Sequence, residues 1–343
     1  MTELVNDTPF EAEISEITGY WEQTAVIAVK GTFCMEPQPA LVDEQVPIRK
    51  VDEYYGDQGS TSIRYPNEIG LQKAGTDIVM IGHAYSRQDR YKASVEVYLQ
   101  VGPCWKIVRV EGHRVWERLL GLPAQSGFTR FKKMPLRYER AYGGTVAKRS
   151  KPDRVKRYRA NPVGTGMTML FGGDKPRIGM AVPNLFDPGL FRNRLAPAGF
   201  GAIGMDWKAR SRFKGTYDKK WKEERAPLLP KDLQPAYWNV AHPDLIAPRF
   251  LRGGEEVIIE NADPTGYIRF ELPQVDFDLE IPLGENTLRP GLPIDLVMLE
   301  PDKNRFSLVW KGFVTHAEGA ADIKQATLSV RQASPALPEV QNE

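Results

Sequence analysis

The sequence predicts a mainly β protein of antiparallel sheets, with two β-sandwich-like lobes bridged by long ordered loops and with little helix. Two observations support this prediction. Runs of alternating apolar and polar residues occur toward both ends of the chain, and a period of two places every second side chain on the same face of a strand. From about residue 122 to 250, glycine and proline recur every few residues, which keeps regular elements short.

The first strands lie in the N-terminal third. Residues 24–33 (TAVIAVKGTF) and 77–82 (DIVMIG) are short runs rich in β-branched residues, as strands are. In residues 94–101 (SVEVYLQV) apolar and polar side chains alternate strictly, which indicates a half-buried strand. We expect residues 105–110 (WKIVRV) to return antiparallel to it, and residues 111–121 to form one or two helical turns.

Strand patterns resume in the C-terminal third. Residues 256–260 (EVIIE), 267–272 (YIRFEL) and 275–281 (VDFDLEI) each read as a strand. Residues 294–314 contain Pro-Asp-Lys-Asn between two apolar runs, and this composition predicts a hairpin with its turn there. Residues 321–330 could add a final strand.

Two apolar runs share a short motif. AVIAVKGTF near the start and LVWKGFV near the end both lead into Lys-Gly followed by phenylalanine, directly or one residue later. The echo is compatible with two structurally related β lobes, although short β patterns also match by chance.

The expected organisation follows from these patterns. A chain of 343 residues fits roughly two domains or one large one. We expect an N-terminal β lobe over residues 1–121, a loop-rich central segment over 122–250 packed on the sheets, and a C-terminal β lobe over 251–332. Residues 333–343 are expected to form a loose tail. The aromatic residues of the central segment favour order, because disordered linkers are poor in them.

Composition narrows the functional class. The chain is 41% hydrophobic and 26% charged with a formal net charge of +2, and a protein built around nucleic-acid phosphates usually has a clear basic excess. The two cysteines, Cys34 and Cys104, are too far apart for a CxxC motif. No secretory signal is visible at the start, and no apolar run approaches the roughly 20 residues that span a bilayer. We therefore expect a cytoplasmic protein without membrane or nucleic-acid partners.

Motifs for cofactors and metals are weak. GFGAIG at residues 199–204 matches G-x-G-x-x-G, but a dinucleotide site needs an apolar strand before the motif and a helix after it. The charged, proline-broken segment before it favours a tight turn that brings Phe200 and Trp207 onto the core. The four histidines have no local metal-ligand spacing. We expect no cofactor, no metal site and no catalytic residues.

Two other functions stay open. Residues 147–160 (AKRSKPDRVKRYRA) carry seven basic residues against one aspartate and could bind nucleic acid, steer an acidic protein or simply be solvated. An enzyme of unknown reaction would have its site in the glycine-rich central segment. Its acid and base candidates are Asp206, Asp218, Glu223 and His242.

The segment GTYDKKWKEERAPLLP, residues 215–230, is the main candidate for partner binding. KKWKEER can form one or two helical turns, with Tyr217 and Trp221 four residues apart on one face. Pro227 must end that helix. Aromatic and arginine side chains among weak ion pairs are typical of a protein interface. The candidate partner-binding residues are Trp207, Arg210, Tyr217, Trp221, Arg225, Tyr237 and Trp238.

The order of short motifs resembles one bacterial family, the domain of unknown function 2169 family (DUF2169). The resemblance covers about residues 1–315, and one departure from it is His113, where an aspartate is expected. The motifs that carry it are VNDTPF, AVIAVKGTF, KAGTDIVMIGHA, VGPCWKIVRVEGHRVW, MPLRYERAYGG, NPVGTGM, VPNL, PAGFGAIGMDWKAR and GTYDKKWKEERAPLLPKDLQPAYWN.

The resemblance implies a role beside type VI secretion systems. Members are encoded near the spike protein, valine-glycine-repeat protein G (VgrG), and near toxic effectors. They are regarded as adaptors or chaperones that help to load an effector onto the spike, and we expect this chain to be a non-enzymatic adaptor. The family has no agreed catalytic residues, so the site residues named above come from the sequence patterns alone.

Overall fold

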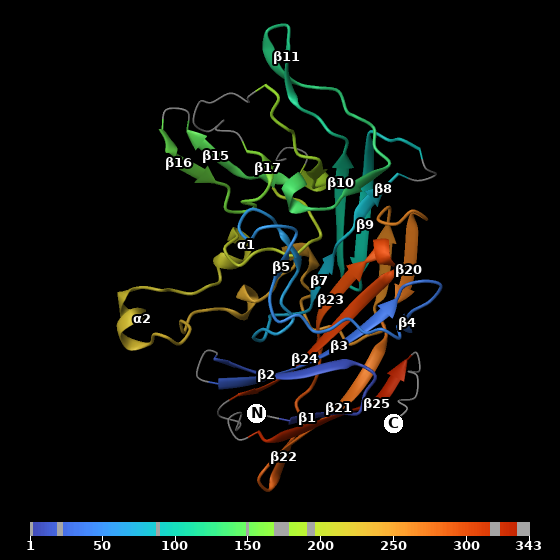
Figure 1. Cartoon of the computed structure of the whole chain (residues 1–343), viewed down its shortest axis with the longest axis vertical. Coiled ribbons are helices and arrows are strands. Elements are labelled where there is room, and N and C mark those ends of the chain that lie inside the picture. Colours follow the sequence, from blue (N-terminus) through green and yellow to red (C-terminus); the bar gives the residue numbers. More distant parts are fainter. Residues whose placement is uncertain are drawn as a thin grey trace.

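The computed structural model describes the chain apart from residues 1–2, 19–22, 87–89, 149–150, 168–177, 191–195, 316–322 and 335–343. The predicted mainly β fold is confirmed, with several antiparallel sheets (Figure 1). In the described residues the only α-helices are two short ones, α1 (Lys208–Ser211) and α2 (Lys219–Glu224). The short 3-10 helices are η2 (Tyr138–Arg140), η4 (Pro188–Leu190), η5 (Pro235–Tyr237), η6 (Pro243–Leu245) and η7 (Pro301–Lys303).

A six-stranded sheet forms the centre of the molecule (Figure 1). Its strands run antiparallel, except that β7 is parallel to β23. Most side chains of the two middle strands are buried, so both faces of the sheet are covered. In sheet order the strands are β2 (Glu11–Thr18), β3 (Gln23–Cys34), β24 (Arg305–Thr315), β23 (Ile294–Glu300) and β7 (Asp77–Met80), and β4 (Ala40–Leu41) pairs with β3.

A four-stranded sheet packs against one end of this central sheet. An aromatic cluster joins the two sheets: the ring centre of Phe277 lies 5.6 Å from that of Phe10 and 5.1 Å from that of Trp310, both edge to face. Such edge-to-face pairs contribute about 0.5–1.5 kcal/mol beyond their buried area. The strands are β1 (Glu3–Asn6), β25 (Gln325–Ser334), β21 (Gln274–Leu283) and β22 (Asn286–Leu288), in sheet order.

A five-stranded antiparallel sheet lies on the far side of the central sheet from the four-stranded sheet, toward the top in Figure 1. Residues 94–101 alternate between buried and less buried side chains, as their sequence indicated, and the less buried face of the sheet also carries apolar side chains such as Trp105. In sheet order the strands are β18 (Leu185–Phe186), β10 (Cys104–Glu111), β9 (Ser94–Val101), β19 (Glu256–Glu260) and β20 (Tyr267–Glu271).

Five two-stranded pairs complete the fold. They are β11 (Trp116–Leu119) with β12 (Leu122–Gln125), β8 (His83–Tyr85) with β13 (Lys133–Pro135), β14 (Tyr142–Gly143) with β17 (Thr165–Gly166), β15 (Thr145–Lys148) with β16 (Lys151–Arg157), and β5 (Glu53–Tyr54) with β6 (Ile63–Tyr65). The basic segment 147–160 thus falls largely on the β15–β16 hairpin.

The strand predictions are confirmed, and the helical prediction for residues 111–121 is wrong. Residue 111 ends β10, and residues 116–119 form the whole of β11, which pairs with β12. The chain reverses at Leu120 and Gly121, whose φ angles are 51° and 82°. Two consecutive positive φ angles define the tight turn that suits a two-residue hairpin, and this turn overrides the weak helical pattern.

Strands from the N-terminal third of the chain pair with strands from the C-terminal third in the same sheets. β24 pairs with β3 along the whole length of β24, and β9 pairs with β19. The strands that carry the two Lys-Gly motifs are therefore direct neighbours. Lys30 and Lys311, the lysines of these motifs, are both buried.

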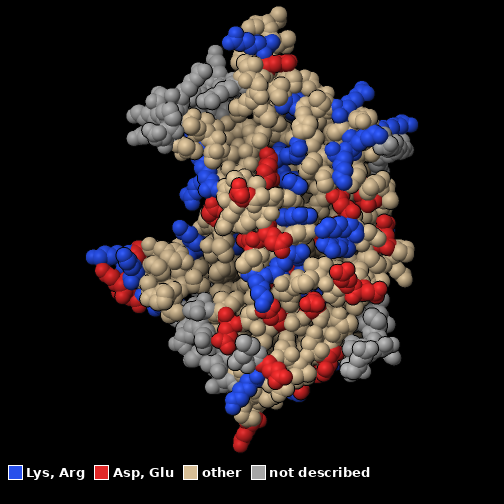
Figure 2. Space-filling view, in the orientation of Figure 1, with Lys and Arg blue, Asp and Glu red and all other residues tan. Residues whose placement is uncertain are grey.

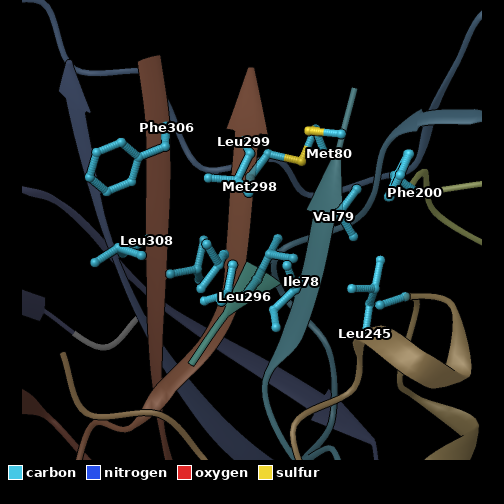
Figure 3. Close-up of a cluster of buried hydrophobic side chains, with 14 of the residues drawn as sticks. Ile78, Val79, Met80, Phe200, Leu245, Leu296, Met298, Leu299, Phe306 and Leu308 are labelled. Atoms are coloured by element: carbon cyan, nitrogen blue, oxygen red, sulfur yellow. The ribbon is translucent and has the colours of Figure 1, made fainter. Parts of the chain in front are cut away.

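The central segment packs on the sheets through buried side chains. Figure 3 shows Phe200 and Leu245, both from this segment, beside Val79 of β7. All three are fully buried. The described parts of residues 122–250 thus contribute to the same core as the strands.

No helix in the described part of the chain is long and apolar enough to cross a membrane.

Candidate partner-binding site

Residues 215–233 form a projecting segment, which we call the arm. Figure 1 shows it reaching away from the sheets with α2 at its tip, and Figure 2 shows acidic and basic side chains there. The carboxylate of Asp218 accepts a hydrogen bond from the backbone N–H of Trp221 at 2.8 Å and so caps the start of α2. This cap is favourable because the first N–H groups of a helix have no partner within it. The predicted helix is confirmed.

The arm is held together by its own aromatic residues. Tyr217 and Trp221 meet edge to face with ring centres 4.6 Å apart. The indole N–H of Trp221 donates to the carbonyl of Leu228 at 2.9 Å, and Arg225 donates to the carbonyl of Leu229. These contacts tie the helix to the chain that returns from it, so the arm has a defined shape although α2 itself buries none of its side chains.

The base of the arm is closed by a clasp. The N–H and hydroxyl of Thr216 donate to the two carboxylate oxygens of Asp232 at 2.9 and 2.7 Å. The Thr216 bonds lower the pKa of Asp232. Gly215 has φ of 75°, and a Cβ there would lie 2.8 Å from the backbone nitrogen of Leu233, so the close approach of the two chain ends requires glycine.

A groove of about 700 Å³ lies between the base of the arm and the central sheet. The arm contributes Leu229 to its wall, the central segment contributes Trp238, and β2 contributes Ile17. Its volume is in the range of ligand pockets, and its wall combines apolar surface with charged groups. The groove can therefore receive a side chain or a short segment of a partner protein.

Four buried charges surround the floor of the groove. The ammonium of Lys73 lies 2.8 Å from Asp77 and 2.7 Å from Asp295, and that of Lys311 lies 3.0 Å from Asp295. Burial lowers the pKa of Lys73, but Asp295 and Asp77 outweigh it and the net pKa is raised. Burial lowers the pKa of Lys311, and Asp295 offsets this only in part.

Arg210 adds a third cation to the groove. Its guanidinium is buried and donates to the carbonyls of Ile203 at 2.7 Å and Tyr237 at 3.0 Å. Among the residues that the structure describes, no carboxylate lies within ion-pair distance of it. Burial lowers its pKa, and more distant carboxylates oppose this effect. A cation in such a position favours an anionic group in the groove.

The structure divides the seven predicted binding residues into three groups. Tyr217, Trp221 and Arg225 lie on the arm, while Arg210, Tyr237 and Trp238 lie at or beside the groove. Trp207 lies inside the fold, where its ring packs edge to face on Tyr138 with centres 5.1 Å apart. Trp207 therefore supports the site from within and presents no surface to a partner. For the other six, partner binding stays a prediction.

The sequence patterns did not single out two features. The first is the pair of buried lysines at the groove floor, Lys73 and Lys311, which look like ordinary surface lysines in the sequence. Only Lys311 stood out, because it belongs to the shared Lys-Gly motif. The second feature is the tip of the β11–β12 hairpin, where the exposed fractions of Leu119, Leu120 and Leu122 are 61%, 96% and 69%. Leu120 also has a left-handed backbone, which is unfavourable for leucine.

The four acid and base candidates of the enzyme alternative each interact with a different partner and do not form one cluster. Their partners are Arg157 for Asp206 at 3.5 Å, the α2 cap for Asp218, Lys219 for Glu223 at 3.6 Å, and Asp244 for His242 at 3.3 Å. The GFGAIG motif bends at Phe200 and Gly201 and does not form the predicted tight turn, although Phe200 and Trp207 are both buried as expected. Only the four-residue α1 follows it.

A second cavity of about 650 Å³ lies beside β10. The buried ammonium of Lys106 lies 2.7 Å from Asp244 and 3.6 Å from Asp187 at its wall. Burial and the nearby Lys106 lower the pKa of His242 to about 4. Two carboxylates thus converge here, and both are within reach of one lysine.

A comparison with protein families places the chain in a known family. The family model described as "Uncharacterized protein conserved in bacteria (DUF2169)" matches residues 21–311. No curated protein and no solved structure matches the chain.

Proposed function

The chain belongs to the DUF2169 family, and on that premise we propose that it is a non-enzymatic adaptor that binds a type VI secretion effector and helps to load it onto the VgrG spike. The proposal places the protein in the cytoplasm, where effector and spike would meet before secretion. It uses no cofactor. The resemblance of the motif string described above is its starting point.

The arm and the groove together are the observation that supports effector binding. The arm is an ordered projection whose aromatic residues are braced by their own contacts. Beside its base the groove combines an apolar wall with the buried cation of Arg210. Aromatic and arginine side chains carry much of the binding energy at protein interfaces. In this proposal the effector contacts Tyr217 and Trp221 and places an acidic group in the groove.

An adaptor needs a second contact surface for its second partner. The leucine tip of the β11–β12 hairpin lies well apart from the arm (Figure 1). Exposed leucines at a projecting tip fit an apolar hollow on another protein. We assign the spike to this tip, because the two partners can then be held at the same time.

The enzyme alternative would use the cavity with Lys106, Asp187 and Asp244. We favour the adaptor because Lys106 already lies within ion-pair distance of both carboxylates. The alternative predicts a turnover that Asp244→Asn abolishes. The nucleic-acid alternative would use the β15–β16 hairpin and predicts binding that weakens steeply between low and moderate salt.

The experiment is a binding measurement with the purified full chain. The effector encoded beside its gene and the VgrG protein are tested singly and together by size-exclusion chromatography and calorimetry. The adaptor proposal predicts a ternary complex and no turnover. If the chain binds neither protein, the proposal is wrong.

A further inference from the structure

Two arginines outside the arm and groove share one tyrosine ring. The guanidinium carbon of Arg137 lies 3.8 Å from the ring centre of Tyr55, and that of Arg64 lies 5.8 Å from the same centre and 5.0 Å from the ring centre of Tyr65. Among the described residues, neither guanidinium group forms an ion pair or donates a hydrogen bond. Stacking holds a guanidinium by its face and leaves the N–H groups at its edge available for a carboxylate.

The carboxylates near these arginines are engaged by other donors. The pairs are Glu139 with Ser62, Glu300 with Tyr65, Lys303 and Arg305, and Asp302 with His83 and Tyr85. Burial raises the pKa of Tyr55 to about 12, so its phenol stays neutral and supplies no negative charge. The charges of Arg64 and Arg137 are therefore not neutralised by a direct partner.

Both arginines line a small cavity of about 80 Å³. Lys303 and His83 also lie at its wall, together with the carboxylates of Glu300 and Asp302. The cavity has room for one small polar group rather than for a whole ligand.

We propose that Arg64 and Arg137 form a binding site for a carboxylate of an acidic polypeptide segment. The paired guanidinium groups match the planar geometry of a carboxylate. A carboxylate is favoured over a phosphate dianion, because Glu300 and Asp302 at the cavity wall repel the second negative charge. The site shares no residue with the arm or the groove and is independent of the adaptor proposal.

The test uses a fluorescein-labelled deca-glutamate peptide and fluorescence anisotropy at low salt, where surface charges are weakly screened. The Arg64→Gln/Arg137→Gln double variant is expected to bind the peptide about tenfold more weakly or worse. The matched control is Arg269→Gln/Arg289→Gln, which removes the same charge from arginines that pair with Glu256 and Glu280. It should bind like the native chain.

Three outcomes would overturn the proposal. They are absence of peptide binding to the native chain, equal weakening in both double variants, and unchanged binding in the Arg64→Gln/Arg137→Gln variant. A competition experiment shows which kind of anion the site prefers. Acetate should displace the peptide at least as well as inorganic phosphate does, and preferential displacement by phosphate would contradict a carboxylate site.

Discussion

Asp77, the first residue of β7, holds Asn239 of the central segment: its carboxylate accepts a hydrogen bond from the Asn239 amide at 3.1 Å. The same carboxylate accepts from the backbone N–H groups of Val240 at 2.9 Å and Ala241 at 3.0 Å. It also pairs with Lys73. One buried carboxylate thus fixes the end of the central segment to the sheet and to the groove floor.

We expect Asp77→Asn to lower the free energy of unfolding by about 3–5 kcal/mol, because it breaks a buried ion pair and places an amide against backbone N–H donors. Chemical denaturation measures the change. Asp43→Asn, at an exposed position, should change stability by no more than about 0.5 kcal/mol. Equal stability of the two variants would show that Asp77 does not anchor the segment.

The stability of the protein should fall as the pH is lowered from 6.5 to about 4. Burial and Lys106 lower the pKa of His242 to about 4 from 6.5, so within this window the unfolded chain binds a proton that the folded chain does not. The full difference corresponds to about 3 kcal/mol. Denaturation at several pH values should show a flatter profile for His242→Asn, which keeps a cap acceptor for Asp244.

His113→Asn is the control for the pH profile. Burial and Arg140 also lower the pKa of His113, but less than that of His242 is lowered, so its replacement should leave most of the slope between pH 6.5 and 4. A His242→Asn variant that loses as much stability as the native chain in this window would contradict the assignment.

Alanine variants of Trp207 and Tyr217 should have different effects: the first should lower stability, and the second should weaken effector binding. Trp207→Ala removes a buried ring from its contact with Tyr138 and should cost about 3–5 kcal/mol of stability. Tyr217, with an exposed fraction of 45%, should cost no more than about 1 kcal/mol when replaced by alanine. Calorimetry with the effector should show weaker binding for Tyr217→Ala, and a destabilised Tyr217→Ala with normal affinity would reverse its assigned role.

Leu120→Asn should stabilise the fold by about 0.5–1 kcal/mol, because asparagine tolerates the left-handed backbone better than leucine. It should also weaken binding to the spike. Leu122→Asn is the matched variant: its side chain is similarly exposed, but Leu122 is not among the residues with positive φ. It should weaken spike binding without raising stability. Unchanged spike binding in both variants would remove the hairpin tip from the proposal.

Much of the strand content could be predicted from the sequence, and the strand partners could not. The alternation in residues 94–101 shows which side chains are buried, and β9 has those bounds. Alternation carries no information on neighbours, so the pairing of β3 with β24 across nearly the whole chain came only from the structure. The helical expectation for residues 111–121 failed because the turn at Leu120 and Gly121 depends on backbone angles that the pattern does not encode.

The candidate partner-binding site could also be predicted only in part, because the sequence does not show which distant residues meet. The aromatic and charged composition of residues 215–230 pointed to the arm, and the α2 helix formed where its spacing indicated. Burial separates residues that look alike in sequence: Trp207 is inside the fold, and Trp221 is on the arm. Lys73 and Lys311 became recognisable only once distant segments brought Asp77 and Asp295 to them.

The most direct test removes the arm and keeps its clasp. Residues 217–231 are replaced by Gly-Ser, which the bonds between Thr216 and Asp232 allow because they already hold the two ends together. We predict that the variant keeps its stability within about 1 kcal/mol, still binds the spike, and loses effector affinity by about 30-fold or more, as expected when an anchoring tryptophan is lost. Effector binding as tight as that of the native chain would contradict the account.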